Sequence, residues 1–169
     1  MNIDYSASAE FLRNFFGPTT EHNVEIRSLP QEHGGGPNRA RFTRDTEIAC
    51  EHLVKWDQPG RACYFGGCTR ITGKASGTRA DCAEMPGLWV DIDCEKQSFS
   101  KSDAVSAALS LPMRPSLLVD SGGGIHGYWL LNEAMPVELG PLCDDDDIIA
   151  VLRQLAGVLA GDPAVCDIA

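Results

Sequence analysis

The hydrophobic pattern of the first half of the chain predicts two helices and two strands. A helix is expected from Ser8 to Phe16, capped by a serine and ended by Gly17-Pro18. Asn23 to Leu29 alternates apolar with charged residues and predicts a strand, and 62–66 is a second short strand. The segment between them, QEHGGGPNRARF, has the composition of a loop. Residues 45–56 predict an amphipathic helix whose apolar side carries Ile48, Ala49, Leu53 and Trp56.

The second half adds three strands and two helices. A long loop, 67–86, precedes an apolar strand that runs from Leu88 to Ile92 or Asp93. Residues 100–109 predict a small helix, and 147–159 a longer one with acidic residues at its start. Two further strands, 116–120 and 127–131, are joined by SGGGIH and predict a hairpin. The order indicates an α+β fold with a mixed, largely antiparallel sheet and flanking helices.

Length and composition favour one domain over residues 1–169. The chain is 43% hydrophobic, which is enough for a core. No stretch approaches the about 20 apolar residues that span a bilayer, and the N-terminus lacks the layout of a signal peptide. We therefore expect a cytoplasmic protein with no membrane partner.

The seven cysteines are expected to be reduced, because their number is odd and no short disulfide framework repeats. Cys63, Cys68 and Cys82 could supply three zinc ligands. Their spacing matches no standard zinc motif and no fourth ligand is evident, so buried thiols are the preferred interpretation.

The formal net charge of −10 argues against nucleic-acid binding through a basic surface. Part of the excess negative charge comes from four consecutive aspartates, Asp144 to Asp147. An acidic chain remains compatible with an enzyme that handles phosphates through cations held by its own carboxylates.

Two carboxylates, Asp91 and Asp93, follow the apolar strand in GLWVDIDCEK. Side chains at positions i and i+2 of a strand point the same way, so both carboxylates are expected on one face. Paired carboxylates repel each other unless a proton or cation lies between them. The pattern therefore indicates a site for Mg²⁺ or Mn²⁺, with a solvated strand end as the alternative.

The hairpin connection, Ser121-Gly122-Gly123-Gly124-Ile125-His126, contains more glycine than a tight turn needs. Three glycines let the backbone approach an anion, and His126 can donate to a phosphate oxygen. The alternative is a flexible connection with an incidental histidine. A third candidate, Asp162 in AGDPAVCDIA, is weak alone because Gly-Asp-Pro is an ordinary turn.

Together, LWVDID, LLVDSGGGIHGYW and GDPAVCD occur in an order that resembles the three active-site motifs of the archaeo-eukaryotic primase superfamily. The likeness is greatest to primase-polymerase domains of bacteriophage and plasmid replication proteins. It implies an RRM-like catalytic core, acting in a bacterial or phage-infected cell. It also implies that the domain is truncated within or just after the third motif, since an arginine-containing, Pro-Gly-bearing segment is expected after Ala169.

The resemblance implies specific roles for the site residues. Asp91, Asp93 and Asp162, with Asp167 as the fallback for the third acid, would hold two Mg²⁺ or Mn²⁺ ions. His126 and the loop Ser121, Gly122, Gly123 and Gly124 would bind a nucleoside triphosphate. The implied partners are nucleoside triphosphates, a single-stranded DNA template and a helicase module in the full-length protein. Many family members have a serine where this chain has Gly124.

Two other functions are the alternatives. A metal-dependent phosphoesterase or nuclease would use the same carboxylates with water as nucleophile. A non-catalytic platform for single-stranded nucleic acid would use exposed aromatic residues and a positive surface, which the net charge of −10 does not favour. For template binding by a polymerase, Tyr128 or Trp129 could stack on a base or sugar, and Trp129 is rather expected in the core. The basic residues that flank the motifs and could meet phosphates are Arg70, Lys74, Arg79, Lys96 and Arg114.

Overall fold

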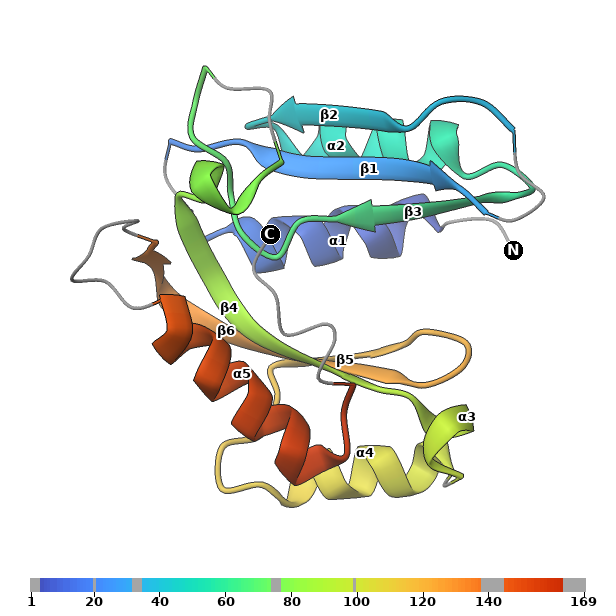
Figure 1. The fold of residues 1–169 in the computed structure, drawn as a ribbon, viewed down its shortest axis with the longest axis vertical. Coiled ribbons are helices and arrows are strands. Elements are labelled where there is room, and N and C mark those ends of the chain that lie inside the picture. The colour runs from blue at the N-terminus through green and yellow to red at the C-terminus, as the bar shows by residue number, and fades with distance from the viewer. Residues whose placement is uncertain are drawn as a thin grey trace. The chain divides into compact units, whose positions relative to one another are not determined.

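The computed structural model describes residues 4–19, 21–31, 35–73, 77–98, 100–137 and 145–162. Figure 1 shows their helices and strands. The strands form two three-stranded sheets, with the strand orders β2-β1-β3 and β4-β6-β5. The elements are α1 Tyr5–Phe16, β1 Val24–Pro30, β2 Arg39–Thr43, α2 Thr46–Trp56, β3 Arg61–Phe65, a 3₁₀ turn Arg79–Asp81, β4 Glu84–Ile92, α3 Cys94–Gln97, α4 Lys101–Ser110, β5 Leu117–Asp120, β6 Ile125–Pro136 and α5 Asp145–Leu159.

The α+β class and the antiparallel pairing are confirmed, although the strands form two sheets rather than one. The chain divides into two compact units. The first contains Met1–Pro86 with Glu133–Val137, and the second contains Gly87–Asn132 with Glu138–Asp167. No helix in the described ranges is long and apolar enough to cross a membrane.

Helix α1 begins three residues before the predicted start. Asp4 is its N-cap, and the Asp4 carboxylate accepts a 3.1 Å hydrogen bond from the backbone N–H of Ala7. The predicted serine cap was therefore wrong, because a carboxylate upstream satisfies the first free N–H groups and allows the helix to start earlier. Helix α2 begins as predicted, with Asp45 accepting from two backbone N–H groups.

Strand β2 was missed by the sequence analysis, which assigned its residues to a loop. It pairs antiparallel with β1, with Ile26 opposite Arg41 and Val24 opposite Thr43. β2 is an edge strand, and two of its five residues are arginines. The strand was missed because it is short and directly follows a stretch with three glycines and a proline, although Arg39 to Thr43 alternates polar with apolar residues.

The core of the first unit lies between its sheet and the helices α1 and α2. Phe15 and Ile26 are fully buried, and the ring of Phe65 on β3 lies 5.7 Å from that of Phe15. Helix α2 contacts all three strands of this sheet. Its buried side holds Ala49 and Leu53 as predicted, but Ile48 remains 36% exposed.

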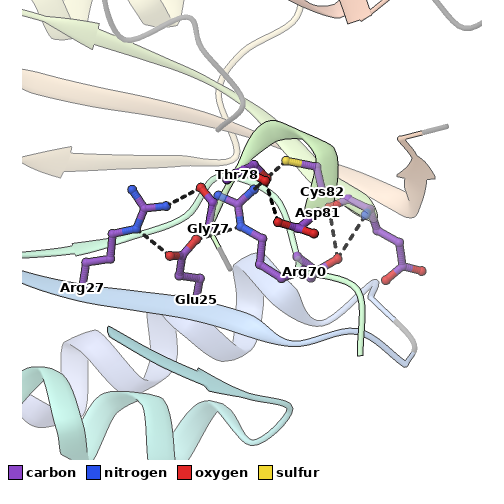
Figure 2. A network of polar contacts seen from close by, with 9 residues as sticks. Glu25, Arg27, Arg70, Gly77, Thr78, Asp81 and Cys82 are labelled. Carbon is purple, nitrogen blue, oxygen red and sulfur yellow. Dashed lines mark hydrogen bonds and ion pairs between the residues drawn. The ribbon is translucent and has the colours of Figure 1, made fainter. Parts of the chain in front are cut away.

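A buried ion-pair network ties the loop after β3 to β1 (Figure 2). Arg70 is fully buried and its Nε donates to Glu25 Oε2 at 2.7 Å, while its Nη1 donates to Cys82 Sγ at 2.6 Å. Arg27 donates to the other carboxylate oxygen of Glu25 and to the carbonyl of Gly77. Arg70 was a candidate phosphate contact in the sequence analysis. Its burial against Glu25 makes it a structural residue instead.

The second unit contains the predicted hairpin. β5 pairs antiparallel with β6, with Leu117 opposite Tyr128 and Asp120 opposite Ile125. Helix α4 has the expected serine cap, in which Ser100 and Asp103 form a reciprocal capping box. The core of this unit consists of small and branched side chains from the sheet and from helices α4 and α5: Val90, Ile92, Ala104, Ala108, Ile125, Leu152 and Ala156.

Candidate functional site

Asp91 and Asp93 lie at the end of β4 but have different local roles. Asp91 is the last strand residue but one, and its apolar neighbours Val90 and Ile92 are buried. Asp93 lies beyond the strand and is the N-cap of α3. Its Oδ1 accepts a 3.0 Å hydrogen bond from the backbone N–H of Lys96. The two carboxylates are therefore held by different elements, rather than by the regular alternation of one strand.

His126 lies beside Asp91. His126 is the second residue of β6, and its Nε2 lies 3.3 Å from Asp91 Oδ1. On the other side of the ring, Nδ1 is 3.4 Å from the hydroxyl of Tyr128. Burial, and then the charge of Asp91, raises the pKa of Tyr128, so its phenol stays protonated. A carboxylate only accepts hydrogen bonds, so the Nε2 that faces Asp91 carries a proton, and in the neutral ring Nδ1 accepts from the phenol.

Asp162 joins the same site through the backbone. Its N–H donates a 2.7 Å hydrogen bond to the carbonyl oxygen of Asp91. The preceding residue, Gly161, packs so closely that a β-carbon there would lie 2.5 Å from Val90 Cγ2 and 2.9 Å from Asp91 O. The third motif is therefore anchored directly to the first. Asp167, the fallback third acid, lies outside the described residues.

Lys96 is the site residue whose role the sequence analysis missed. Its Nζ lies 3.0 Å from Asp93 Oδ2 and 3.4 Å from Asp162 Oδ2. The backbone N–H of Lys96, and then its ammonium, hold the pKa of Asp93 below its ordinary value. The two carboxylates, Asp93 first, raise the pKa of Lys96. The lysine was counted only as one of several flanking cations, because nothing in CEKQ indicates that it turns back onto Asp93.

The glycine loop is partly satisfied by its own hydrogen bonds. The N–H of Ser121 donates to Gly124 O at 3.1 Å, and the N–H of Gly122 donates to Asp120 Oδ1 at 2.8 Å. Asp120 also pairs with the ammonium of Lys101 at 2.6 Å. A phosphate clamp made by backbone N–H groups would therefore rely on Gly123 and its C-terminal neighbour.

Position 124 has no room for a side chain. A β-carbon on Gly124 would lie 2.1 Å from the carbonyl oxygen of Ile92 and 3.2 Å from the Cα of Asp93. This close approach brings the second motif against the first. Any side chain at this position, a serine included, would clash with the backbone of Ile92.

The three carboxylates suit a hard divalent cation by the chemistry of their oxygen atoms. Mg²⁺ and Mn²⁺ prefer oxygen ligands. The three acids lie at one end of β4, because Asp162 bonds to the backbone of Asp91 and Lys96 contacts both Asp93 and Asp162. Among the described residues, however, no three His, Cys, Asp or Glu side chains form a group that could hold a metal ion. The ammonium of Lys96 lies between two of the three acids instead.

Other residues that the sequence analysis considered for zinc, stacking or phosphate contacts lie in different surroundings. Cys68 and Cys82 are buried, as expected for core thiols. Trp129 is in the core as predicted, and its Nε1 donates to Met113 O at 2.8 Å. Tyr128 is only 6% exposed and cannot serve as an open stacking surface. Lys74 lies outside the described residues.

Two solved structures are similar to this chain. The crystal structure of the primase RepB′ matches with a TM-score of 0.53 and 16% identity, over 96% of this chain and 47% of that chain. The catalytic domain of primase RepB′ in complex with initiator DNA matches with a TM-score of 0.52 and 17% identity, over 95% of this chain and 72% of that one.

No family model matches the sequence, and no curated protein matches it. The chain spans about half the length of the first RepB′ chain. At these identities the likeness shows a shared fold. This chain therefore has the fold of a primase catalytic domain.

Proposed function

We propose that this chain is the catalytic core of a primase-polymerase that transfers nucleotides onto a strand paired with a single-stranded DNA template, in phage or plasmid replication. The observation that carries the proposal is the meeting of three distant motifs at Asp91. Asp162 donates to its carbonyl oxygen, and His126 lies against its carboxylate. The fold shared with the RepB′ catalytic domain supports the same function.

The proposed roles follow from the local chemistry. Asp91, Asp93 and Asp162 would hold two Mg²⁺ or Mn²⁺ ions, which supply charge stabilisation for the attacking and leaving oxygens at phosphorus. His126 presents Nε2–H beside Asp91, so it can donate to a phosphate oxygen held next to that carboxylate. The phenol of Tyr128, 3.4 Å from Nδ1, would favour this tautomer by donating to Nδ1.

The glycine loop would complete the triphosphate site. Gly124 lies against the backbone of Ile92 and Asp93, so a nucleotide on the loop is next to the carboxylates. The N–H of Gly123 is the backbone donor that we assign to a phosphate oxygen. The template strand and a helicase module remain part of this proposal, as partners that the primase resemblance implies.

Pyrophosphate release tests the reaction class. The chain is incubated with deoxynucleoside triphosphates, Mn²⁺ and a single-stranded template, and pyrophosphate is measured for wild type, Asp91→Asn and Asp147→Asn. Asp147 is an exposed carboxylate on α5 and serves as the matched control. We expect release from wild type and Asp147→Asn and at least a 100-fold lower rate for Asp91→Asn, an order typical of lost electrostatic stabilisation. Equal rates in all three proteins would contradict the proposal.

A further inference from the structure

Lys96 lies between two carboxylates that come from distant parts of the chain. Its ammonium contacts Asp93 Oδ2 at 3.0 Å and Asp162 Oδ2 at 3.4 Å, and Asp162 is 66 residues away in sequence. An ammonium is a compact charge with three donors, so it can bridge two acids at once. Lys96 thus makes the side-chain link between the first and third motifs.

The position of Lys96 is built by the one-turn helix α3. Asp93 caps this helix, and the same carboxylate that accepts from the backbone N–H of Lys96 through Oδ1 pairs with its ammonium through Oδ2. Ser98 ends the helix in a left-handed conformation at φ 57°. Because Asp93 holds both the backbone N–H and the ammonium of Lys96, the ammonium lies beside the acids although the side chain is largely exposed.

We infer that Lys96 is a built-in counter-cation that competes with a divalent ion for the carboxylates of Asp93 and Asp162. This inference rests on the proposed function, because it assigns those acids to ion binding. An ammonium and a divalent cation repel each other at contact distances and need the same oxygens, so both cannot occupy this position. The lysine side chain is 71% exposed, which gives it space to leave when an ion binds.

The counter-cation has a physical purpose. Asp91, Asp93 and Asp162 gather negative charge at the end of β4, and repulsion between carboxylates costs free energy unless a cation offsets it. Lys96 supplies that charge from within the chain. Because the ion must displace this ammonium, the apparent affinity of the site for the ion would be lower than without the lysine. The displaced ammonium would then lie near the place where a nucleotide phosphate is proposed to bind.

Titration with Mn²⁺ alone, followed by calorimetry or by the loss of free-ion paramagnetic signal, tests the competition. Wild type is compared with Lys96→Met, with Lys96→Gln as a second variant. Lys101→Met is the matched control, since Lys101 pairs with Asp120 rather than with the three acids. We expect Mn²⁺ to bind about 1.5- to fivefold more tightly to both Lys96 variants, the range that follows from removing a solvent-exposed ion pair. Lys101→Met should bind like wild type.

The other outcomes separate the inference from the proposed function. Suppose that wild type binds Mn²⁺ and Asp93→Asn does not. If both Lys96 variants then bind Mn²⁺ as tightly as wild type or more weakly, the competition is overturned and the ion site stands. Weaker binding would mean that the lysine preorganises the acids. Binding seen only in the Lys96 variants would support competition. No Mn²⁺ binding in any of these proteins would overturn both the inference and the ion site.

Discussion

The backbone N–H of Asp162 donates a 2.7 Å hydrogen bond to the carbonyl oxygen of Asp91, which joins the segment after α5 to the end of β4. This bond places the least specific of the three sequence motifs beside the most specific one. It requires that the chain at Gly161 pass within van der Waals contact of the strand. The geometry of the site therefore depends on a glycine that bears no functional group.

Gly161→Ala should destabilise the second unit by about 1–3 kcal/mol, the usual cost of forcing a methyl group into a packed position. The new β-carbon would lie 2.5 Å from Val90 Cγ2 and 2.9 Å from Asp91 O. Gly157→Ala is the matched control, because Gly157 lies four residues earlier, on α5, and a β-carbon there meets nothing within 4 Å. Urea unfolding should show Gly157→Ala as neutral or more stable. A Gly161→Ala protein as stable as wild type would mean that this close contact does not exist.

Arg70→Met should destabilise the first unit by about 3 kcal/mol or more, because it leaves the buried carboxylate of Glu25 with less compensation. Arg13→Met is the comparison. It removes an exposed pair with Glu47 and should cost less than about 1 kcal/mol. Unfolding curves of the two variants, read against wild type, check the difference. Similar small losses in both would show that the network in Figure 2 contributes little.

The bridge made by Lys96 should be intact at neutral pH and should be lost in acid. The pKa of Asp93 is lowered from its ordinary 3.8 in the folded chain, so the stabilisation is present above 3.8 and disappears as the pH falls through the lower folded value. An NMR titration of the Asp93 carboxyl should therefore have its midpoint below 3.8. In Lys96→Met the midpoint should move only part of the way back, since the backbone N–H of residue 96 still donates to Asp93. A midpoint at or above 3.8 in wild type would contradict the capping geometry.

Tyr128→Phe should change the proton position on His126. In wild type Nε2 carries the proton that faces the Asp91 carboxylate, which leaves Nδ1 of the neutral ring to accept from the phenol. Nitrogen chemical shifts of the imidazole in alkaline buffer distinguish the two tautomers. We expect the Nε2–H form in wild type and a mixture in Tyr128→Phe, with Trp129 packing unchanged. The same tautomer ratio in both proteins would show that the phenol has no influence on the ring.

The sequence was sufficient to predict the helices that have a strong amphipathic pattern. It was also sufficient for the hairpin, because SGGGIH separates two apolar strands. Patterns of this kind are local, and a local pattern identifies an element without its neighbours. Strand β2 was missed because its five residues directly follow a glycine- and proline-containing stretch whose composition indicates a loop.

The roles of Lys96 and Arg70 could not be predicted for a different reason. Each is a cation in a polar stretch, and such residues are usually solvated. Arg70 is buried because Glu25, 45 residues earlier, meets it in the core. Lys96 is held because Asp93 caps a helix of only four residues, too short to show any periodicity. Arg70 is thus positioned by a tertiary contact, and Lys96 by a local cap together with a contact to the distant Asp162.

Extension of an end-labelled primer on a single-stranded DNA template, resolved by length on a denaturing gel, tests the central claim most directly. Wild type is compared with Asp91→Asn, Asp162→Asn and the control Asp147→Asn, in Mg²⁺ and in Mn²⁺. The account predicts metal-dependent lengthening of the primer by wild type and Asp147→Asn, and none by the other two. Metal-dependent shortening of the strand would instead indicate a nuclease. An unchanged primer, bound tightly by all four proteins, would contradict catalysis and favour a non-catalytic nucleic-acid platform.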